Sequence, residues 1–207
     1  MRTLTRRTVA LALALCLIFP SINIAAPVRV GNVMPLHNEA GRNFCTAWHI
    51  NAKDDLWATA GHCVAGAARQ RWTMMISGHK AELVYIGYDE QRDVAVLKVV
   101  GLRARTIKFA KAAPHRGDAA TVAGYPYGLP VLTVTSGTVA ARLVPIGATA
   151  PISDILDIIV AGGNSGSPVL NKDGEAIGLL WGTFTESAHS LSIPWESLKR
   201  DIGGYFE

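Results

Sequence analysis

The sequence has little charge of either sign and few cysteines, and it lacks internal repeats and long windows of helical periodicity. Charged residues make up 17% of the 207 residues, too many for a polytopic membrane protein, and 49% are hydrophobic, too many for a disordered chain. Twenty glycines and ten prolines are spread along the chain, which excludes a collagen-like or low-complexity protein. The length predicts one domain or two small ones.

The formal net charge of +4 comes mostly from the first 26 residues. This segment contains Arg2, Arg6 and Arg7 and no acidic residue, so the 20 basic residues of the chain fall to 17 without it, against 16 acidic ones. A net charge this close to zero does not indicate nucleic-acid binding, and no nucleic-acid partner is expected.

Residues 1–26 have the pattern of a secretory signal peptide. An arginine-containing start precedes the eleven-residue apolar run Val9–Phe19, and the segment ends in small residues at Ala25 and Ala26. Because the run is short for a spanning helix, we expect cleavage near Ala26 and no stable membrane insertion afterwards. The sequence therefore predicts a secreted or periplasmic protein, with a retained membrane anchor as the alternative.

Few cysteines remain once the leader is removed. Cys16 leaves with it, and Cys45 and Cys63 stay. An even pair in an oxidising compartment predicts one disulfide. The alternatives are two reduced, buried cysteines, or a zinc site that also uses His49 and His62, although the adjacency of His62 and Cys63 makes joint ligation awkward.

The rest of the chain favours strands and turns over helices. The runs expected as strands include Ala81–Tyr88, Asp93–Val100, Ala119–Tyr125, Val131–Val144, Ser167–Asn171 and Glu175–Gly182. Turn residues separate these runs, and Asp173-Gly174 predicts a tight hairpin. One short helix is expected over Trp195–Asp201, because Pro194 suits a helix start. Many short strands at this spacing indicate a sandwich or a barrel.

The segment Gly162-Gly163-Asn164-Ser165-Gly166-Ser167-Pro168 contains the candidate nucleophile. Glycines on both sides of Ser165 allow a tight turn that exposes the hydroxyl group. They also let the N–H groups of Gly163 and Ser165 converge on one point, as an oxyanion hole requires. The alternative is a glycine-rich hairpin loop with an idle serine.

His62 and Asp93 are the candidates for the base and for the carboxylate that orients it. His62 follows an apolar run and precedes Cys63, so a disulfide would hold it rigidly, as a general base requires. Asp93 begins a run apolar enough to be largely buried, where a carboxylate can still bond to an imidazole. Asp89, the nearest competitor, looks like an exposed loop residue. The alternatives are a packed histidine and a turn aspartate that caps a strand.

Together these motifs resemble the trypsin-like serine proteases. The order His62, Asp93, Ser165 is that of the chymotrypsin-like fold, and Gly163–Leu179 is similar to the serine motif of bacterial HtrA-type proteases and glutamyl endopeptidases. The resemblance covers about residues 40–200. It implies an all-β protease domain over residues 27–207, with two packed six-stranded antiparallel β-barrels, about 28–115 and 116–200, and the active site in the cleft between them.

The resemblance also implies the activity. It indicates a secreted serine endopeptidase that cleaves protein or peptide substrates through an acyl-enzyme, with no metal or organic cofactor. Asn164 stands where pancreatic-type members have an aspartate, so activation by an ion pair at this position is not expected. HtrA-type proteins usually carry a PDZ domain after the protease, but the sequence ends at Glu207, so no PDZ-mediated partner is expected. A catalytically dormant binding protein and an esterase-like enzyme are the alternatives.

The pocket for the side chain before the cleaved bond is inferred from the same resemblance. The expected pocket residues are Ile159, Leu180, Trp181, Gly182 and Ser190, with Ser192 as a further candidate. Because Ile159 offers no carboxylate to a cation, a small or medium apolar residue is expected there instead of Arg or Lys. His189 leaves glutamate recognition as an alternative.

Overall fold

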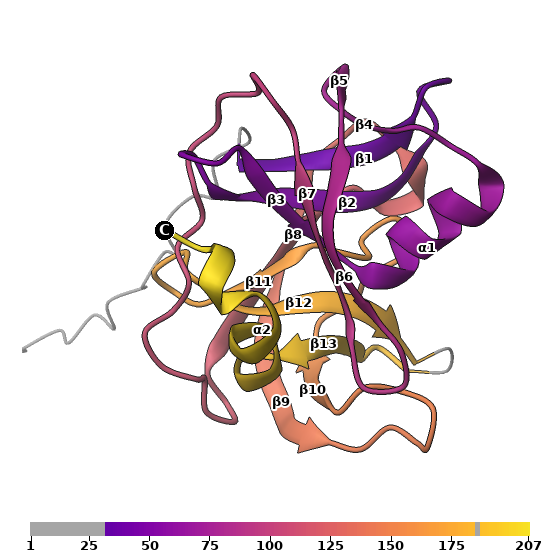
Figure 1. The fold of residues 1–207 in the computed structure, drawn as a ribbon. Helices are drawn as coiled ribbons and strands as arrows, with labels where there is room; N and C mark the ends of the chain where they lie inside the picture. Colours follow the sequence, from indigo (N-terminus) through magenta and orange to yellow (C-terminus); the bar gives the residue numbers. More distant parts are fainter. Residues whose placement is uncertain (1–31, 185–186) are drawn as a thin grey trace, which may run out of the picture.

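The structure is a computed structural model that describes residues 32–184 and 187–207, and these form two β units with two short α-helices (Figure 1). The predicted signal peptide lies outside the described residues. None of the described helices is long and apolar enough to cross a membrane.

The first unit is a curled antiparallel sheet with the strand order β5-β4-β1-β2-β3-β7-β6. Its strands are β1 (Val33–Asn38), β2 (Asn43–Asn51), β3 (Leu56–Thr59), β4 (Met74–Ile76), β5 (His79–Lys80), β6 (Glu82–Tyr88) and β7 (Asp93–Lys98). The family resemblance implies a six-stranded barrel here, and the structure has a curled half-barrel sheet of seven strands in its place. The end strand β5 has only two residues, both exposed, and does not pair with β6 at the other end.

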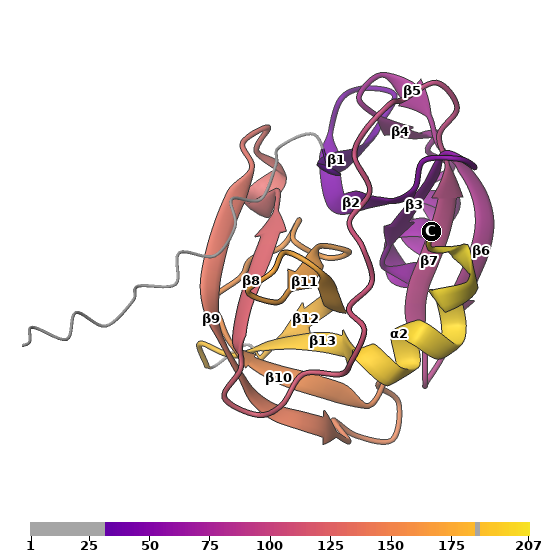
Figure 2. The ribbon, with the colours of Figure 1, turned by 90° about the vertical axis from the view of Figure 1, so that its left-hand side faces the viewer.

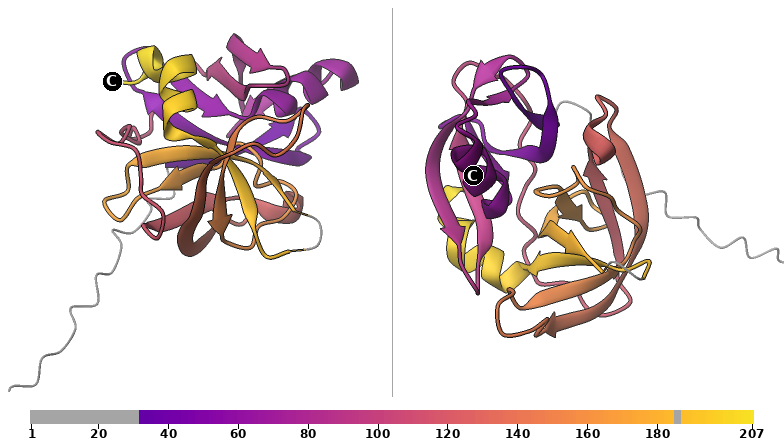
Figure 3. Two further views of the ribbon diagram at one scale, coloured as in Figure 1. Left: turned by 90° about the horizontal axis from the view of Figure 1, so that it is seen from below. Right: turned by 90° about the vertical axis from the view of Figure 1, so that its right-hand side faces the viewer.

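The second unit is a closed antiparallel barrel with the order β10-β13-β12-β11-β8-β9. Its strands are β8 (Ala119–Gly124), β9 (Thr133–Val144), β10 (Ser153–Asp157), β11 (Pro168–Leu170), β12 (Ala176–Thr183) and β13 (Ser190–Pro194). The two units lie side by side in both views of Figure 3. The predicted all-β architecture is confirmed, and so is the hairpin at Asp173-Gly174, where Gly174 N–H donates to Asn171 O at 3.0 Å.

Helix α2 (Trp195–Ile202), followed by the short 3-10 turn η3 (Gly203–Tyr205), connects the barrel to the sheet. It leaves β13 of the barrel and lies against β7 of the sheet (Figure 2). Leu198 and Ile202 are fully buried in a core cluster that consists mostly of sheet residues and also includes barrel residues such as Leu179. Phe206 packs against Trp48 with 5.6 Å between ring centroids. The predicted C-terminal helix is confirmed.

Helix α1 (Gly61–Gln70) is absent from the sequence prediction, which has no helix there. Its N-cap residue, Ala60, makes no side-chain capping hydrogen bond, and two glycines lower its helix propensity. The helix is held instead by close packing, because a Cβ on Gly61 would lie 2.8 Å from Gly87 O. This close approach places the start of α1 beside the first residue of β7.

Candidate active site

His62 and Asp93 meet where α1 begins and β7 starts. The Asp93 carboxylate accepts two hydrogen bonds, from His62 Nδ1 at 2.7 Å and from the His62 backbone N–H at 2.7 Å. Asp93 is buried, whereas the His62 side chain is 31% exposed. The two bonds fix the direction of the imidazole ring and leave its Nε2 atom available to a second partner.

Ser165 reaches this place from the barrel, on the loop that precedes β11. Its carbonyl oxygen accepts a hydrogen bond from Thr46 N–H of β2 at 2.9 Å. Cys63 Sγ lies 3.7 Å from His62 Nε2 and 3.9 Å from Ser165 O, so one sulfur atom contacts both residues. Within the described ranges, no hydrogen bond joins Ser165 Oγ to His62, a contact that often tightens only when substrate binds.

The turn before Ser165 holds its backbone amides in a defined direction. Asn164 N–H donates to Ala161 O at 3.1 Å and Gly163 has φ +100°, the pattern of a type II turn with glycine at its third position. Tyr127 N–H donates to Gly162 O at 2.6 Å. Because the C=O and N–H of a trans peptide point in opposite directions, the Gly163 N–H faces away from Tyr127.

The amides expected to form the oxyanion hole are both free of protein acceptors. Neither Gly163 N–H nor Ser165 N–H donates to any acceptor in residues 32–184 and 187–207. Two unpaired donors on one tight turn are what a developing oxyanion needs.

Thr46 is a site residue whose role the sequence analysis missed. Its N–H donates to Ser165 O at 2.9 Å, and its Oγ1 donates to Gly163 O at 2.9 Å and accepts from Tyr125 N–H at 3.1 Å. A residue of the sheet thus fixes both ends of the candidate oxyanion turn on the barrel. Its one signal in the sequence is its place directly after Cys45, the predicted partner of Cys63.

Asn164 is buried against the backbone of Gly124. A Cβ on Gly124 would lie 2.5 Å from Asn164 Oδ1 and 2.1 Å from Ser167 Oγ, so only glycine fits there. Asn164 Oδ1 has no hydrogen-bond partner among the described residues. The neutral amide provides no charge for an ion pair, in line with the expectation from the sequence.

A disulfide joins Cys45 and Cys63, with 6.3 Å between their Cα atoms, as predicted. The ligand atoms of Cys45, His62 and Cys63 lie within 4.8 Å of one another. Both sulfur atoms are used in the disulfide and neither is a thiolate, so the zinc alternative and the reduced-cysteine alternative are excluded. His49, the fourth ligand considered, instead lies in the core with its ring 4.9 Å from that of Trp57.

The expected pocket residues lie on the barrel side of Ser165. Leu180 O accepts from Gly166 N–H at 2.7 Å, but its side chain is buried in the barrel core. Trp181 and Gly182 follow it on β12, and Ser190 pairs in register with Thr183. Ile159 lies beyond β10 with its side chain 70% exposed.

His189 and Ser190, which are neighbours in the chain, have different surroundings. The His189 Nδ1 atom lies 3.3 Å from Ser187 Oγ in the segment that precedes β13. Ser190 is fully buried, and its hydroxyl has no partner in the part of the chain that the structure describes. Of these polar groups, only the Ser190 hydroxyl combines burial with an unused hydrogen-bonding capacity.

Comparisons with known proteins agree with this geometry. The family described as trypsin-like peptidase domain matches residues 45–179. A protein of Rhizobium meliloti named probable periplasmic serine endoprotease DegP-like is 34% identical over 157 residues, and one of the same name from Halomonas elongata is 32% identical over 174 residues. The matches cover 72% and 80% of this chain but only 31% and 36% of the two relatives, so the chain spans about a third of their length.

Solved structures with the same fold are more distant in sequence. The active form of the Rv3671c protease from M. tuberculosis has a TM-score of 0.63 at 21% identity, covering 84% of this chain and 80% of that one. Deg5 has a TM-score of 0.63 at 21% identity, covering 82% and 86%. These likenesses confirm the predicted fold class, two packed β units of the trypsin-like type.

Proposed function

Because the chain belongs to the trypsin-like peptidase family, we propose that it is a serine endopeptidase with His62, Asp93 and Ser165 as its catalytic residues. The observation that carries the proposal is the pair of hydrogen bonds from His62 to the buried Asp93 carboxylate, one of them from the ring. The two free amides of Gly163 and Ser165 support it independently.

In this mechanism Ser165 Oγ attacks the carbonyl carbon of the scissile peptide bond while His62 Nε2 accepts the hydroxyl proton. Asp93 keeps the ring in the tautomer with Nδ1–H and stabilises the imidazolium that forms. The Gly163 and Ser165 amides bind the oxyanion, and His62 then gives its proton to the leaving amine. A water molecule, activated by the same histidine, releases the acyl group and restores Ser165.

The predicted signal peptide and the names of the relatives indicate the proposed cellular location. Residues 1–26 have the pattern of a signal peptide, and the Rhizobium and Halomonas relatives are named periplasmic. The Cys45–Cys63 disulfide fits an oxidising compartment. These observations support a secreted or periplasmic protease acting on proteins or peptides.

The residue before the cleaved bond is proposed to be small or medium and apolar. The proposed pocket consists of Ile159, Leu180, Trp181, Gly182 and Ser190, and none of these carries a charge. The Trp181 ring is held by a hydrogen bond from its Nε1–H to Ser153 Oγ at 3.0 Å, so it forms a fixed wall. Ser190 has a buried hydroxyl without a hydrogen-bond partner among the described residues, so this side chain offers an unused hydrogen-bonding group.

Fluorophosphonate labelling of the mature protein tests the proposed nucleophile. We expect one adduct, mapped to Ser165 by mass spectrometry, that disappears in Ser165→Ala. Ser136→Ala is the matched control, because Ser136 is an exposed serine on β9. If a folded protein with its disulfide intact shows no labelling, the proposal fails and the dormant binding protein takes its place.

A further inference from the structure

A groove of about 430 Å³ opens beside the candidate oxyanion turn. We call it the glycine groove, and it is lined by Gly41, Arg42, Asn43, Phe44, Tyr127, Gly128, Gly162 and Gly163. Half of these residues have no side chain, so the floor is bare backbone that an extended peptide can approach closely. Asn43 Nδ2 donates to Gly128 O at 3.2 Å and joins the two walls.

The glycine groove adjoins the candidate oxyanion turn and shares no residue with the proposed pocket. It includes Gly163, whose carbonyl accepts a hydrogen bond from Thr46 Oγ1, and extends over Phe44 and Asn43 at the start of β2 to the preceding Gly41. A substrate with its scissile carbonyl on the oxyanion amides, and its acyl side chain toward Trp181 and Ser190, continues in this direction. The groove therefore faces the leaving-group side of the cleaved bond.

Arg42 is the one charged residue that lines the glycine groove. Its guanidinium lies over the Trp72 ring, 5.6 Å from the centroid, and forms no ion pair with a residue of the described ranges. The nearby Glu39 instead accepts a hydrogen bond from Thr73 N–H at 2.7 Å. A cation–π contact with the indole does not use the guanidinium N–H groups as a carboxylate would, so they stay available to one.

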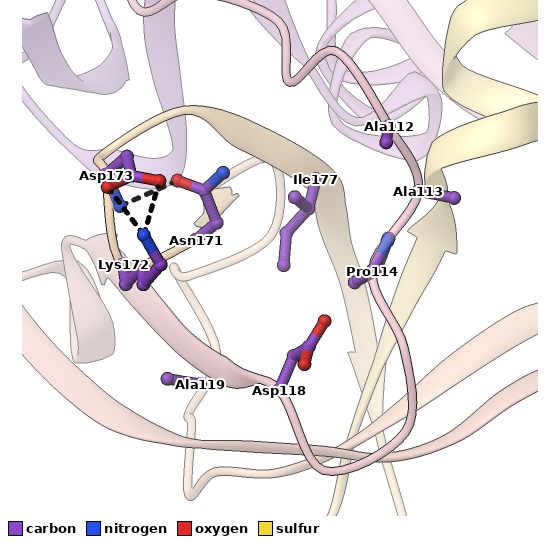
Figure 4. Close-up of a pocket in the computed structure, with 9 residues that line it drawn as sticks. All are labelled: Ala112, Ala113, Pro114, Asp118, Ala119, Asn171, Lys172, Asp173 and Ile177. Carbon is purple, nitrogen blue, oxygen red and sulfur yellow. Dashed lines mark hydrogen bonds and ion pairs between the residues drawn. The ribbon is translucent and has the colours of Figure 1, made fainter.

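A second cavity of the molecule differs from the glycine groove in how its cation is paired. It has a volume of about 210 Å³ and lies between the Ala112–Pro114 segment and the β11–β12 turn (Figure 4). Its cation, Lys172, is paired with Asp173 at 3.0 Å, and Asp118 adds a further negative charge. Of these two cavities, only the glycine groove adjoins the candidate oxyanion turn and contains a cation without an ion-pair partner among the described residues.

We propose that the glycine groove binds the segment after the cleaved bond and that Arg42 selects an acidic residue within it. This inference rests on the proposed function. The exposed guanidinium attracts Asp or Glu and repels Lys or Arg, while the glycine floor accepts the peptide backbone. Because the pair is exposed to solvent, we expect about a fivefold preference in kcat/KM, which weakens as salt is added.

Quenched fluorescent peptides test this selection directly. The peptides share one acyl side, taken from any sequence that the enzyme cleaves, and carry Glu, Gln or Lys at each of the first two positions after the cleaved bond. We expect the wild type to cleave in the order Glu, Gln, Lys, and Arg42→Glu to reverse that order. Arg42→Gln should make the three peptides cleave at similar rates. This variant also allows the test to be done if Arg42→Glu does not fold.

The readout is a ratio between peptides within one variant, so a general change in activity cancels. Arg103→Glu is the matched control, because Arg103 is exposed and does not line the groove, and it should keep the wild-type order. Cleavage of all peptides at equal rates, or an order that Arg42→Glu leaves unchanged, overturns the inference while the proposed function stands. If fluorophosphonate does not label Ser165, it is the proposed function that fails.

Discussion

Asp93 accepts both the backbone and the ring N–H of His62, so one carboxylate sets the position and the tautomer of the proposed base. Asp93→Asn keeps the size of the side chain but presents an amide in place of the second oxygen. We expect kcat to fall about 10³- to 10⁴-fold, because the wrong tautomer of His62 is favoured. Steady-state hydrolysis of a cleaved peptide measures the loss.

Asp89→Asn is the matched control for that change. Asp89 is exposed and pairs with Arg92 in the turn between β6 and β7, only four positions from Asp93. It should stay within about twofold of the wild type, since surface ion pairs contribute little. Equal losses in the two variants would contradict the assignment of Asp93.

The variants Gly163→Ala and Gly162→Ala each add one methyl group to the same turn. Comparing their kcat values separates distortion of the oxyanion turn from the mere presence of a methyl group nearby. Gly163 has φ +100°, and a Cβ there would lie 2.4 Å from Tyr125 O, whereas a Cβ on Gly162 would meet nothing within 4 Å. We expect Gly163→Ala to lower kcat about 10²- to 10³-fold by displacing an oxyanion donor, and Gly162→Ala to cause a much smaller loss. Peptide hydrolysis under saturating substrate measures both, and equal losses would count against this turn.

The three proposed catalytic residues could be found from the sequence because each has its own local motif. Ser165 has flanking glycines, His62 a neighbouring cysteine, and Asp93 an apolar strand behind it. Thr46 could not be found this way, because its role consists of hydrogen bonds to a loop more than a hundred positions away. The side-chain directions around Ile159 and Leu180 also depend on how the barrel closes, which no local pattern contains.

At the scale of elements, α2 is the feature with the clearest energetic consequence. It follows the last strand of the barrel, and Ile202 is fully buried in a core cluster that contains residues of both β units. We expect Ile202→Ala to lower the free energy of unfolding by about 2–5 kcal/mol, through lost burial and the cavity that remains. Urea unfolding followed by tryptophan fluorescence measures the change.

Ile152→Ala is the matched control for the α2 prediction. Ile152 is 51% exposed and precedes β10, so the same truncation should change stability by no more than about 0.5 kcal/mol. A similar cost at both positions would show that α2 does not hold the two units together.

The strand runs and α2 were predictable because their residue patterns are local, whereas α1 was not. Its sequence has no capping side chain, and the helix exists because Cys63 is bonded to Cys45 and Gly61 packs on Gly87. The number of strands in the first sheet could not be predicted from the sequence either. Whether the sheet closes depends on pairing between its end strands β5 and β6, and β5 has only two residues.

At the scale of the whole molecule, His49 links stability to pH. It is buried, and burial lowers its pKa below the ordinary value, although carbonyls of Ala104 and Arg105 and the carboxylates of Asp55 and Glu207 oppose this. Below about pH 6.5 the unfolded chain therefore binds a proton that the folded chain resists. The stability from neutral His49 is present above that pH and is lost as the pH falls, by up to about 1.4 kcal/mol per pH unit.

Urea midpoints at about pH 7.5 and pH 5.5 check the pH dependence. His49→Phe keeps an aromatic ring beside Trp57 but cannot bind a proton, so the midpoint should change less between the two conditions. His79→Gln, a change at an exposed histidine, should retain the wild-type difference. An unaltered difference in His49→Phe would show that other groups cause the acid sensitivity.

The loop of Ser165 depends on a strand that comes later in the chain. Gly166 N–H donates to Leu180 O, and Leu180 N–H donates to Ser167 O, so the loop acquires its shape only when β12 is in place. A ribosome delivers His62 and Asp93 long before that strand, and domains fold as their segments emerge. A growing or truncated chain that ends before β12 therefore has the proposed base and its carboxylate but no shaped loop around Ser165. The order of synthesis itself would delay the proposed activity until the barrel is nearly complete.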